Sequence, residues 1–500
     1  MTCASGVAQE SGHPRMAESL SPLDIRGDSL HGWRRVLSCS SSGGQRRSRP
    51  VVVDRLSRRQ LEESMSMHPS NRFRRASVIA GGALASLGVA VSVATPASGA
   101  PPAAHPAPAE HVVLIALDGL DVDYLDGGAM PNLRALAGHG SLSTSTGVMT
   151  SITNPSWSSI ATGAWPSTHG NTAYWYDPVA GAAVGQQRDL AVPTIAESIR
   201  DQGGTVLSSQ WFIVQNHGAA FGDPKGLYTQ PGGDCSRRAD DAVAVINGEP
   251  VMSAGKSVQM DGIPDLIAVY CDRLDALGHA DGDRAPDMPA AVAEVDAQIG
   301  RLVQATKDAG IYGRTAFVVT GDHGMETFTK GMRDDFLAAI SDAGYQAEML
   351  NAGQSPQPGT DVVVVVGGVG SLHLVGEAAD DPDAAARIEA AVSSLPHISA
   401  VYDKAEQEAM HMSPKYGELI VEPEEGWSLG ADPSDGVSGL HGTSREARTA
   451  LVIAGSGVRS HVAPENPRHI DLAPTIAALL GMDGPSGADG RVLGEVVRTR

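Results

Sequence analysis

Short, uninterrupted runs of apolar residues constrain the fold of this chain more than any other feature. The clearest are HVVLIAL at 111–117, DLIAVY at 265–270, TAFVVT at 315–320 and TALVIA at 449–454. Such runs lack polar alternation and are typical of strands buried on both faces. Strands of that kind occur where helices cover both sides of a parallel sheet, so the sequence predicts an α/β fold.

Helical patterns alternate with these runs, as the crossover connections of a parallel sheet require. We expect helices at 131–139, 155–162, 193–202, 290–309 and 471–480. The first three begin with a proline, which is favoured in the first turn of a helix. The predicted fold class is therefore a central, mostly parallel sheet flanked by helices.

The pattern changes between residues 330 and 430. There we expect a smaller α+β unit with helices at 334–343 and 383–395 and strands at 361–366 and 417–421. A chain of 500 residues exceeds what one hydrophobic core usually holds, which favours an insertion. We predict a catalytic domain in two parts, residues 111–329 and 431–500, with a small α+β cap inserted at 330–430.

The start of the chain has the pattern of an export signal. A basic stretch at 71–75 precedes an apolar, uncharged run at 76–93, and small residues at 97–100 resemble a cleavage site. We expect a signal peptide at 65–100 and a Pro/Ala linker at 101–110. Export by the Sec route is expected, although the paired arginines also permit the twin-arginine route. The small residues that follow the apolar run favour cleavage over a stable membrane anchor. A secreted or extracytoplasmic protein is therefore predicted.

Charge is distributed unevenly along the chain. The formal net charge is −21, but residues 1–100 hold 13 Lys and Arg against 7 Asp and Glu. Residues 101–500 keep 24 basic and 51 acidic residues, a net charge of −27. A body this acidic lacks the basic face that nucleic-acid binding needs. To hold a phosphate group it would need bound cations.

The cysteines give a limited signal. Cys3 and Cys39 lie in residues 1–64, a stretch without sustained periodicity that we interpret as a disordered extension or a misassigned start. Cys235 and Cys271 belong to the exported part, where an oxidising compartment allows them to pair. The sequence leaves that pairing open. Neither is part of a CxxC motif, so a thiolate metal site is not expected.

Acidic and imidazole side chains follow the predicted strands where each strand meets a loop. They are Asp118, then Asp275 and His279, then Asp322 and His323, and finally His441 in a Gly-rich loop before the fourth strand. Each motif alone is better explained by turn chemistry than by function. Ligands of open α/β sheets bind at the carboxyl ends of the strands, so the shared position indicates one convergent site. Carboxylates mixed with imidazoles suit Zn²⁺, and also Mn²⁺ or Fe²⁺.

A threonine at the start of a predicted helix is the candidate nucleophile. Thr153 precedes the helix at 155–162, where backbone N–H groups and the helix dipole favour an anionic substrate. A threonine hydroxyl attacks only when a base or a metal lowers its effective pKa. Without the metal motifs, an N-capping threonine with no chemistry would be the preferred interpretation.

Together these motifs resemble the alkaline phosphatase superfamily and, within it, the nucleotide pyrophosphatase/phosphodiesterase family. The resemblance covers the exported part of the chain apart from the cap. Its landmarks are Asp118-Gly119, Met130-Pro131-Asn132-Leu133, Thr153 with Pro155, Thr162-Gly163, His169-Gly170, Asp275 with His279, Gly321-Asp322-His323-Gly324-Met325, His441-Gly442-Thr443 and residues 470–476.

The resemblance implies a two-metal mechanism. One Zn²⁺ would be held by Asp275, His279 and His441, and the other by Asp118, Asp322 and His323 together with the deprotonated Thr153. Thr153 would attack phosphorus and form a covalent phospho-threonine, which water then hydrolyses. The implied activity is hydrolysis of phosphodiester or pyrophosphate bonds in a small phosphate-ester or nucleotide-like substrate.

The chain departs from the family pattern near the nucleophile. Asn154 and Ser156 stand where the family usually has Phe and Asn, and residues 169–177 form a segment one residue shorter than usual. The Asn that contacts phosphate in the family therefore has no counterpart, which weakens the nucleotide prediction. The candidate substrate contacts are Asn154, Trp157, Tyr174 and Trp175. For the aromatic residues, packing under the cap is an equally good interpretation.

Two other functions remain open. The turn Thr153-Asn154-Pro155 is similar to the nucleophile turn of phosphonoacetate hydrolases, relatives that cleave a C–P bond and use added lysines to hold the carboxylate. Here Lys225, Lys256 and Lys330 are not obviously placed for that task. A catalytically inactive binding module on the same fold is the second alternative. The intact set of ligands and nucleophile argues against it.

Overall fold

The computed structural model describes residues 109–498, and an eight-stranded sheet forms its centre. Its strands are β1 (His111–Leu117), β2 (Gly140–Thr146), β5 (Val206–Ser209), β6 (Ala220–Phe221), β7 (Gly226–Thr229), β10 (Leu266–Cys271), β11 (Thr315–Thr320) and β20 (Arg448–Gly455). Their order is β2-β20-β11-β1-β10-β5-β7-β6. Every pairing is parallel except the two made by β20, so the prediction of a mostly parallel sheet is confirmed.

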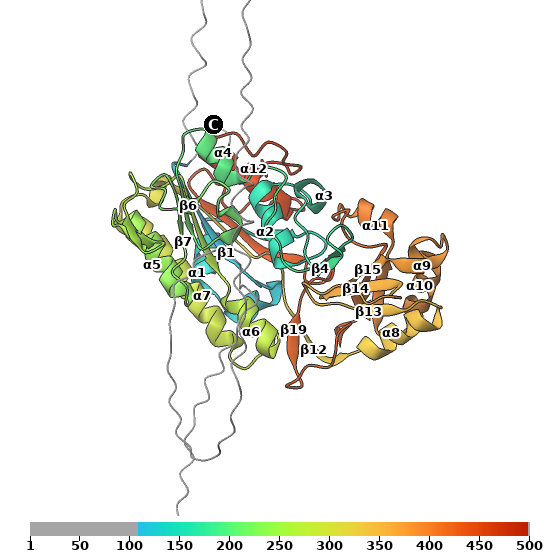
Figure 1. Ribbon diagram of the computed structural model, residues 1–500. Helices are drawn as coiled ribbons and strands as arrows, with labels where there is room; N and C mark the ends of the chain where they lie inside the picture. Colours follow the sequence, from blue (N-terminus) through green and yellow to red (C-terminus); the bar gives the residue numbers. More distant parts are fainter. Residues whose placement is uncertain (1–108, 499–500) are drawn as a thin grey trace, which may run out of the picture. The chain divides into compact units, whose positions relative to one another are not determined.

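Helices cover both faces of this sheet. They are α1 (Pro131–Ala137), α2 (Thr153–Thr162), α3 (Pro166–His169), α4 (Ile195–Asp201), α5 (Cys235–Ile246), α6 (Arg273–Asp281), α7 (Met288–Asp308) and α12 (Leu472–Leu480), with 3-10 turns η1 (Val122–Gly128), η2 (Phe212–Val214), η3 (Tyr312–Arg314) and η4 (His469–Asp471). One core joins α1, α5 and α7 to the sheet, and a second core joins α2, α4 and α12 to the opposite face (Figure 1). Because both faces are covered, β1, β10 and β11 are buried along nearly their whole length, as their apolar runs predicted.

The segment after β10 differs from the sequence-based expectation. Asp275 and His279 were expected in a loop, whereas they lie on α6. The helix passes through Gly278, a residue that disfavours helix interiors. Tertiary packing accounts for it, because Gly278 contacts the Met325 side chain and leaves no room for a Cβ atom. The helix matters for function because it fixes the relative position of the two side chains.

A second, five-stranded sheet forms the inserted unit. Its elements are α8 (Arg333–Asp342), β13 (Ala347–Met349), β14 (Val362–Gly367), β15 (Val369–Leu374), α9 (Gly376–Ala379), α10 (Ala384–Ser393), β16 (Ile398–Tyr402), α11 (Lys404–Ala409) and β17 (Leu419–Pro423). The strand order is β13-β14-β15-β17-β16, and the sheet has its own hydrophobic core against α8 and α10. The fold class, an α/β body with a small α+β insertion, is therefore confirmed (Figure 1).

Three short sheets complete the described fold. Their strands are β3 (Trp175–Asp177) with β4 (Ala182–Val184), β8 (Val251–Ser253) with β9 (Lys256–Val258), and β18 (Gly426–Ser428) with β12 (Glu326–Gly331) and β19 (Ser438–Leu440). The last of these joins the insertion to the body. Its register pairs Glu326 with Leu440, so the segment after β11 and the loop after β19 run side by side.

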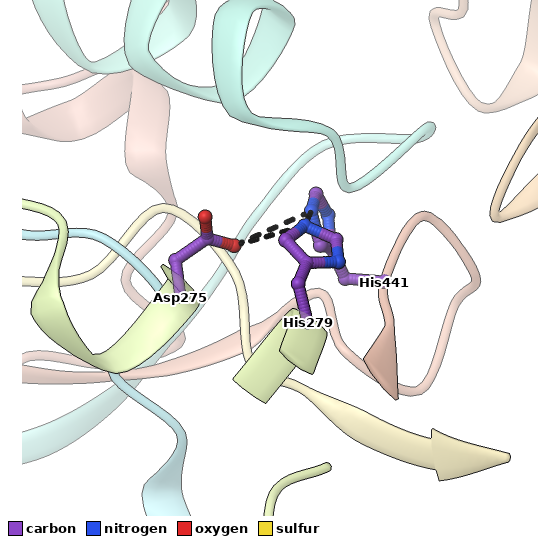
Figure 2. A group of neighbouring side chains, drawn as sticks. All are labelled: Asp275, His279 and His441. Carbon is purple, nitrogen blue, oxygen red and sulfur yellow. Dashed lines mark hydrogen bonds and ion pairs between the residues drawn. The ribbon is translucent and has the colours of Figure 1, made fainter. Parts of the chain in front are cut away.

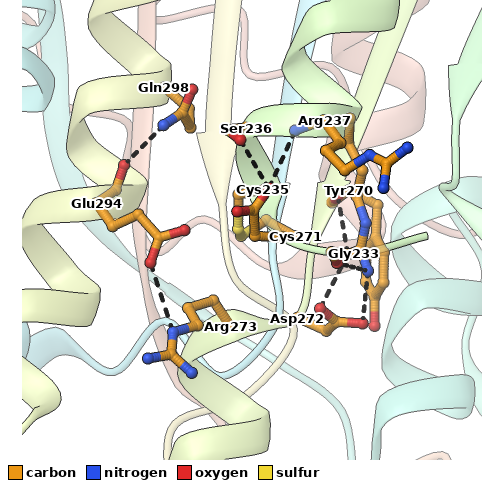
Figure 3. Close-up of a disulfide and its surroundings, with 12 residues drawn as sticks. Gly233, Cys235, Ser236, Arg237, Tyr270, Cys271, Asp272, Arg273, Glu294 and Gln298 are labelled. Carbon is orange, nitrogen blue, oxygen red and sulfur yellow. Dashed lines mark hydrogen bonds and ion pairs between the residues drawn. A yellow bond between two sulfur atoms is a disulfide. The ribbon is translucent and has the colours of Figure 1, made fainter. Parts of the chain in front are cut away.

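A disulfide fastens the end of β10 to the start of α5. Cys235 and Cys271 are bonded, with their Cα atoms 5.2 Å apart, which answers the question that the sequence left open (Figure 3). The next residue, Asp272, receives both Nη groups of the buried Arg238 at 2.9 and 3.0 Å. A covalent bond and a bidentate ion pair thus fix the backbone immediately before α6.

Several predictions concern the start of the chain. The extension at 1–64, the signal peptide at 65–100 and all but the last two residues of the linker lie outside the described residues. Within residues 109–498, none of the helices has the length and apolar character needed to cross a bilayer.

We expect the double substitution Cys235→Ser/Cys271→Ser to lower the free energy of unfolding by about 4 kcal/mol, since the bond closes a loop with a sequence separation of 36. Urea unfolding of the two proteins, each with and without reductant, measures the difference. Reductant should destabilise the native protein and leave the variant unchanged. Equal stabilities under oxidising conditions would show that the bond does not constrain the unfolded chain.

Candidate active site

The carboxyl ends of β1 and β11 bring the first two carboxylates together. These strands are parallel neighbours with Ala116 paired to Thr320, so Asp118 and Asp322 each lie two residues past a matched pair. The Gly119 N–H donates to Asp322 Oδ1 at 3.2 Å. Gly119 has a φ of +71°, and a Cβ atom there would lie 2.9 Å from the Asp275 nitrogen. The turn after β1 therefore packs directly on the start of α6.

The helix α6 supplies two further side chains. Asp275 and His279 are four residues apart, which places them on one face of the helix. Asp275 Oδ1 lies 3.2 Å from His279 Nε2 and 3.6 Å from His441 Nε2 (Figure 2). The two histidine Nε2 atoms are 3.2 Å apart. Three groups from two distant segments thus face a common point.

His323 forms the centre of the other half of the site. Its Nε2 atom lies 3.2 Å from Asp118 Oδ1 and 3.3 Å from Asp322 Oδ2. The same atom is 3.2 Å from the Thr153 hydroxyl oxygen. The rings of His323 and His441 stack with centroids 3.4 Å apart, so the two halves form one cluster. All six expected ligand residues and Thr153 are therefore brought together.

Each of the three histidines has the same orientation. Their Nδ1 atoms lie within hydrogen-bond distance of backbone carbonyls, namely Gly324 O at 2.8 Å, Gly439 O at 3.1 Å and Ser151 O at 2.9 Å. A carbonyl only accepts, so the proton of a neutral imidazole resides on Nδ1. The Nε2 lone pairs then point toward the centre of the cluster, as they do in histidines that bind metals.

The carboxylates also leave one oxygen each toward the centre. Asp118 Oδ1, Asp275 Oδ1 and Asp322 Oδ2 are buried and accept no hydrogen bond. The opposite oxygen of Asp118 accepts from Trp157 Nε1 at 3.2 Å and from the Tyr270 hydroxyl. An unpartnered buried carboxylate oxygen costs several kcal/mol unless a cation neutralises it. The donor set therefore fits bound divalent cations.

Geometry divides these donors into two overlapping groups. Asp275, His279 and His441 form one, and Asp118, Asp275 and His323 form the other, with the ligand atoms of each group within 4.8 Å of one another. Asp275 therefore faces both groups. Asp322 stands outside the second group, although its Oδ2 is next to His323.

Electrostatics of the cluster point the same way. Burial raises the pKa of Asp322, and the Asp118 carboxylate raises it further. Burial alone would lower the pKa of His323, but Asp322 and Asp118 raise it to about 10. Carboxylates this close to one another need a positive charge between them. A divalent cation supplies more positive charge than one protonated imidazole does.

Thr153 is the first residue of α2, with Ile152 in the capping position. The side chain is half-buried and faces His323. At this position the hydroxyl lies at the positive end of the helix dipole, which favours an anion.

The expected substrate contacts have different surroundings. The Asn154 side chain is buried and donates to the Gln187 carbonyl. For Trp157 the structure agrees with the packing alternative and not with substrate stacking, because the side chain is 0% exposed and lies between Trp211 and Tyr270. Its indole N–H instead holds Asp118, a role that only the folded structure reveals.

Two aromatic candidates remain partly exposed. Tyr174 has a φ of +55° and packs on Gly367 at the tip of the β14–β15 hairpin. Burial raises its pKa, and the Asp275 carboxylate raises it further. Gly367 lies in turn against Gly442, the residue that follows His441. Trp175 packs with Met149 and Val369 and lies beneath the Lys415 ammonium, 5.4 Å from its ring centre.

The insertion reaches the site through that same hairpin. Gly368 has a φ of +83°, and a Cβ atom there would lie 1.8 Å from the His441 carbonyl oxygen. The hairpin thus packs against the loop that carries His441 and supports its position.

An α/β body with this sheet order and this cluster defines an alkaline phosphatase-like protein. The sequence profile of the Type I phosphodiesterase / nucleotide pyrophosphatase family matches residues 112–444, and the chain belongs to this family. The resemblance found in the motifs is thereby confirmed.

Curated relatives are distant. An uncharacterised pyrophosphatase/phosphodiesterase of Schizosaccharomyces pombe is 26% identical over 227 residues, 43% of this chain and 44% of that protein. Ectonucleotide pyrophosphatase/phosphodiesterase family member 1 of Mus musculus is 26% identical over 227 residues, 43% of this chain and 24% of that protein. The match spans less than half the length of either relative. A bis(5'-adenosyl)-triphosphatase of Xenopus laevis is 21% identical over 389 residues, 75% of this chain and 78% of that protein.

Solved structures show the shared fold. Human ectonucleotide pyrophosphatase/phosphodiesterase 5 has a TM-score of 0.59 and 18% identity, covering 77% of this chain and 99% of that one. An inactive murine form of the same enzyme in complex with AMP has a TM-score of 0.57 and 18% identity, covering 75% of this chain and 96% of that one.

We expect Gly368→Ala to weaken Zn²⁺ binding roughly 10- to 100-fold, because the new methyl group must displace the His441 loop. Gly353→Ala is the matched control, since Gly353 has the same φ of +83° but open space around it. Competition with a chromogenic chelator measures both affinities. Equal Zn²⁺ affinities in the two variants would contradict a supporting role for the hairpin.

Proposed function

We propose that this protein is a secreted, two-metal hydrolase that cleaves phosphodiester or pyrophosphate bonds through a covalent phospho-threonine. The observation that carries the proposal is a cluster of six ligand-type side chains: five of them form two overlapping groups, and the sixth, Asp322, lies beside His323. The Thr153 hydroxyl oxygen lies 3.2 Å from His323 Nε2 in this cluster. Family membership supports the reaction class.

The proposed ligands follow the two halves of the cluster. One Zn²⁺ would be held by Asp275, His279 and His441, and the other by Asp118, Asp322 and His323 together with Thr153. Mn²⁺ or Fe²⁺ would suit the same donors. When bound, such a pair of cations lowers the pKa of the attacking hydroxyl and stabilises the charge that develops on the phosphoryl oxygens.

Thr153 carries the covalent step. Its hydroxyl loses a proton, Oγ attacks phosphorus, the bond to the leaving oxygen breaks, and that oxygen departs with the electron pair and takes up a proton. Water then loses a proton and attacks the phospho-threonine, the bond from phosphorus to Oγ breaks, and Oγ takes up a proton to restore Thr153. Tyr270 and Trp157 support both steps by holding the far oxygen of Asp118.

A small phosphate ester, and within that class a nucleotide-like molecule, is the proposed substrate. The murine structural relative in complex with AMP supports the nucleotide. Tyr174 is partly exposed and packs on Gly367, in the hairpin that contacts the His441 loop, and is the aromatic side chain that we expect to contact a base or aryl leaving group.

Phosphonoacetate hydrolysis, in which lysines would hold the substrate carboxylate, has less support. Lys225 is exposed and precedes β7, at the edge of the sheet opposite the cluster. Lys256 and Lys330 are exposed on β9 and β12. Among residues 109–498, none of these three lysines makes a hydrogen bond or ion pair with Thr153 or with a side chain of the cluster, so the diester substrate is preferred.

The disulfide favours an extracytoplasmic location, because such bonds persist in oxidising compartments. It agrees with the export signal proposed for residues 65–100.

We expect the purified protein to hydrolyse bis-p-nitrophenyl phosphate, to lose that activity on treatment with a chelator and to regain it with Zn²⁺. Thr153→Ala should abolish turnover, whereas Thr153→Ser should retain part of it because a hydroxyl remains. Release of p-nitrophenol measures each rate, and a monoester, a nucleotide analogue and phosphonoacetate complete the substrate panel.

Asp189→Ala, an exposed change in the same domain, is the control and should match the native rate. Turnover of phosphonoacetate alone would support C–P cleavage instead. Turnover of none of these substrates by the zinc-loaded protein would favour a binding module.

A further inference from the structure

The N-terminus of α2 presents few backbone donors beside the nucleophile. Pro155 has no N–H, and the Ser156 N–H donates to the Ile152 carbonyl at 2.9 Å inside the helix. The outward N–H groups are therefore those of Thr153 and Asn154. These are the groups that an anion at the helix N-terminus would use.

A side-chain amide already occupies one of these donors. The Asn154 N–H donates to Gln186 Oε1 at 3.3 Å. The Asn154 side chain donates to the Gln187 carbonyl, so the segment after β4 is attached to the start of α2 at two points. Gln186 is half-buried, and its neutral Oε1 acceptor occupies the outward N–H of Asn154 at the positive end of the helix dipole, where an anionic oxygen is favoured.

We propose that Gln186 Oε1 takes the place of a non-bridging phosphoryl oxygen in the free enzyme, and that Gln186 Nε2 donates to that oxygen when substrate binds. This inference rests on the proposed function. The substrate oxygen would accept the Asn154 N–H, and the amide of Gln186 would rotate, since its two ends exchange acceptor and donor.

The charges around position 186 explain why an amide suits this position better than a carboxylate. Asp118, Asp275 and Asp322 each direct an unpartnered oxygen into the cluster. A carboxylate at position 186 would add another negative charge facing the phosphoryl group, whereas an amide adds a donor without charge. Gln187 is the matched comparison. Its backbone carbonyl accepts the hydrogen bond from the Asn154 side chain, whereas its own side chain makes no hydrogen bond among residues 109–498.

The test compares Gln186→Ala, Gln186→Glu and Gln187→Ala in the full zinc-loaded protein. We expect Gln186→Ala to lower kcat/KM for bis-p-nitrophenyl phosphate about 10- to 100-fold through loss of one hydrogen bond to an anion. Gln186→Glu should lower it further through charge repulsion, and Gln187→Ala should stay within about twofold of native. Thermal melts establish that all three variants are folded.

Calorimetric binding of inorganic phosphate gives a readout independent of turnover. Phosphate affinity should fall in the order native, Gln186→Ala, Gln186→Glu, with Gln187→Ala equal to native. If the native protein turns over the diester and all three variants match it in kcat/KM and phosphate affinity, the role of Gln186 is refuted and the hydrolase survives. If the native protein lacks turnover, the proposed function fails, and equal phosphate affinities would refute Gln186 separately.

Discussion

Three buried carboxylate oxygens without hydrogen-bond partners are the constraint around which this structure is organised. Asp118 Oδ1 and Asp322 Oδ2 lie 3.2 and 3.3 Å from His323 Nε2, and Asp275 Oδ1 lies 3.2 Å from His279 Nε2. Desolvated negative charges repel one another and are tolerated only when positive charge is nearby. The surrounding structure enforces the arrangement, because the opposite oxygen of Asp118 is held by Tyr270 and Trp157. The cluster therefore supplies side chains that could hold cations.

Three local structural features bring the cluster residues together from segments far apart in the chain. The parallel register of β1 and β11 sets Asp118 beside Asp322. The four-residue spacing on α6 sets Asp275 beside His279, and the disulfide with the Arg238–Asp272 ion pair fixes the start of that helix. The β12–β19 pairing then brings the His441 loop alongside β11's carboxyl end. Each of these features is common in proteins, and together they form the site.

Much of this could be predicted from the sequence, because the informative patterns are local. The uninterrupted apolar runs indicate strands covered on both faces, and acidic residues at their ends indicate convergence at one edge. The contacts of Trp157 with Asp118 could not be predicted, because a hydrogen bond between residues 39 positions apart leaves no periodic trace. For the same reason the sequence does not decide between substrate stacking and packing for Trp157, and it gives no signal for Gln186. The helix through Gly278 was missed because packing against Met325, and not helix propensity, stabilises it.

The most direct test of the central claim is a crystal structure of the zinc-soaked protein with anomalous data collected at the zinc edge. Two peaks about 4 Å apart are predicted. One should contact Asp275, His279 and His441, and the other Asp118, Asp322 and His323 within reach of the Thr153 hydroxyl. An anomalous map without peaks in this cluster, or a Thr153 side chain turned away from them, would contradict the account.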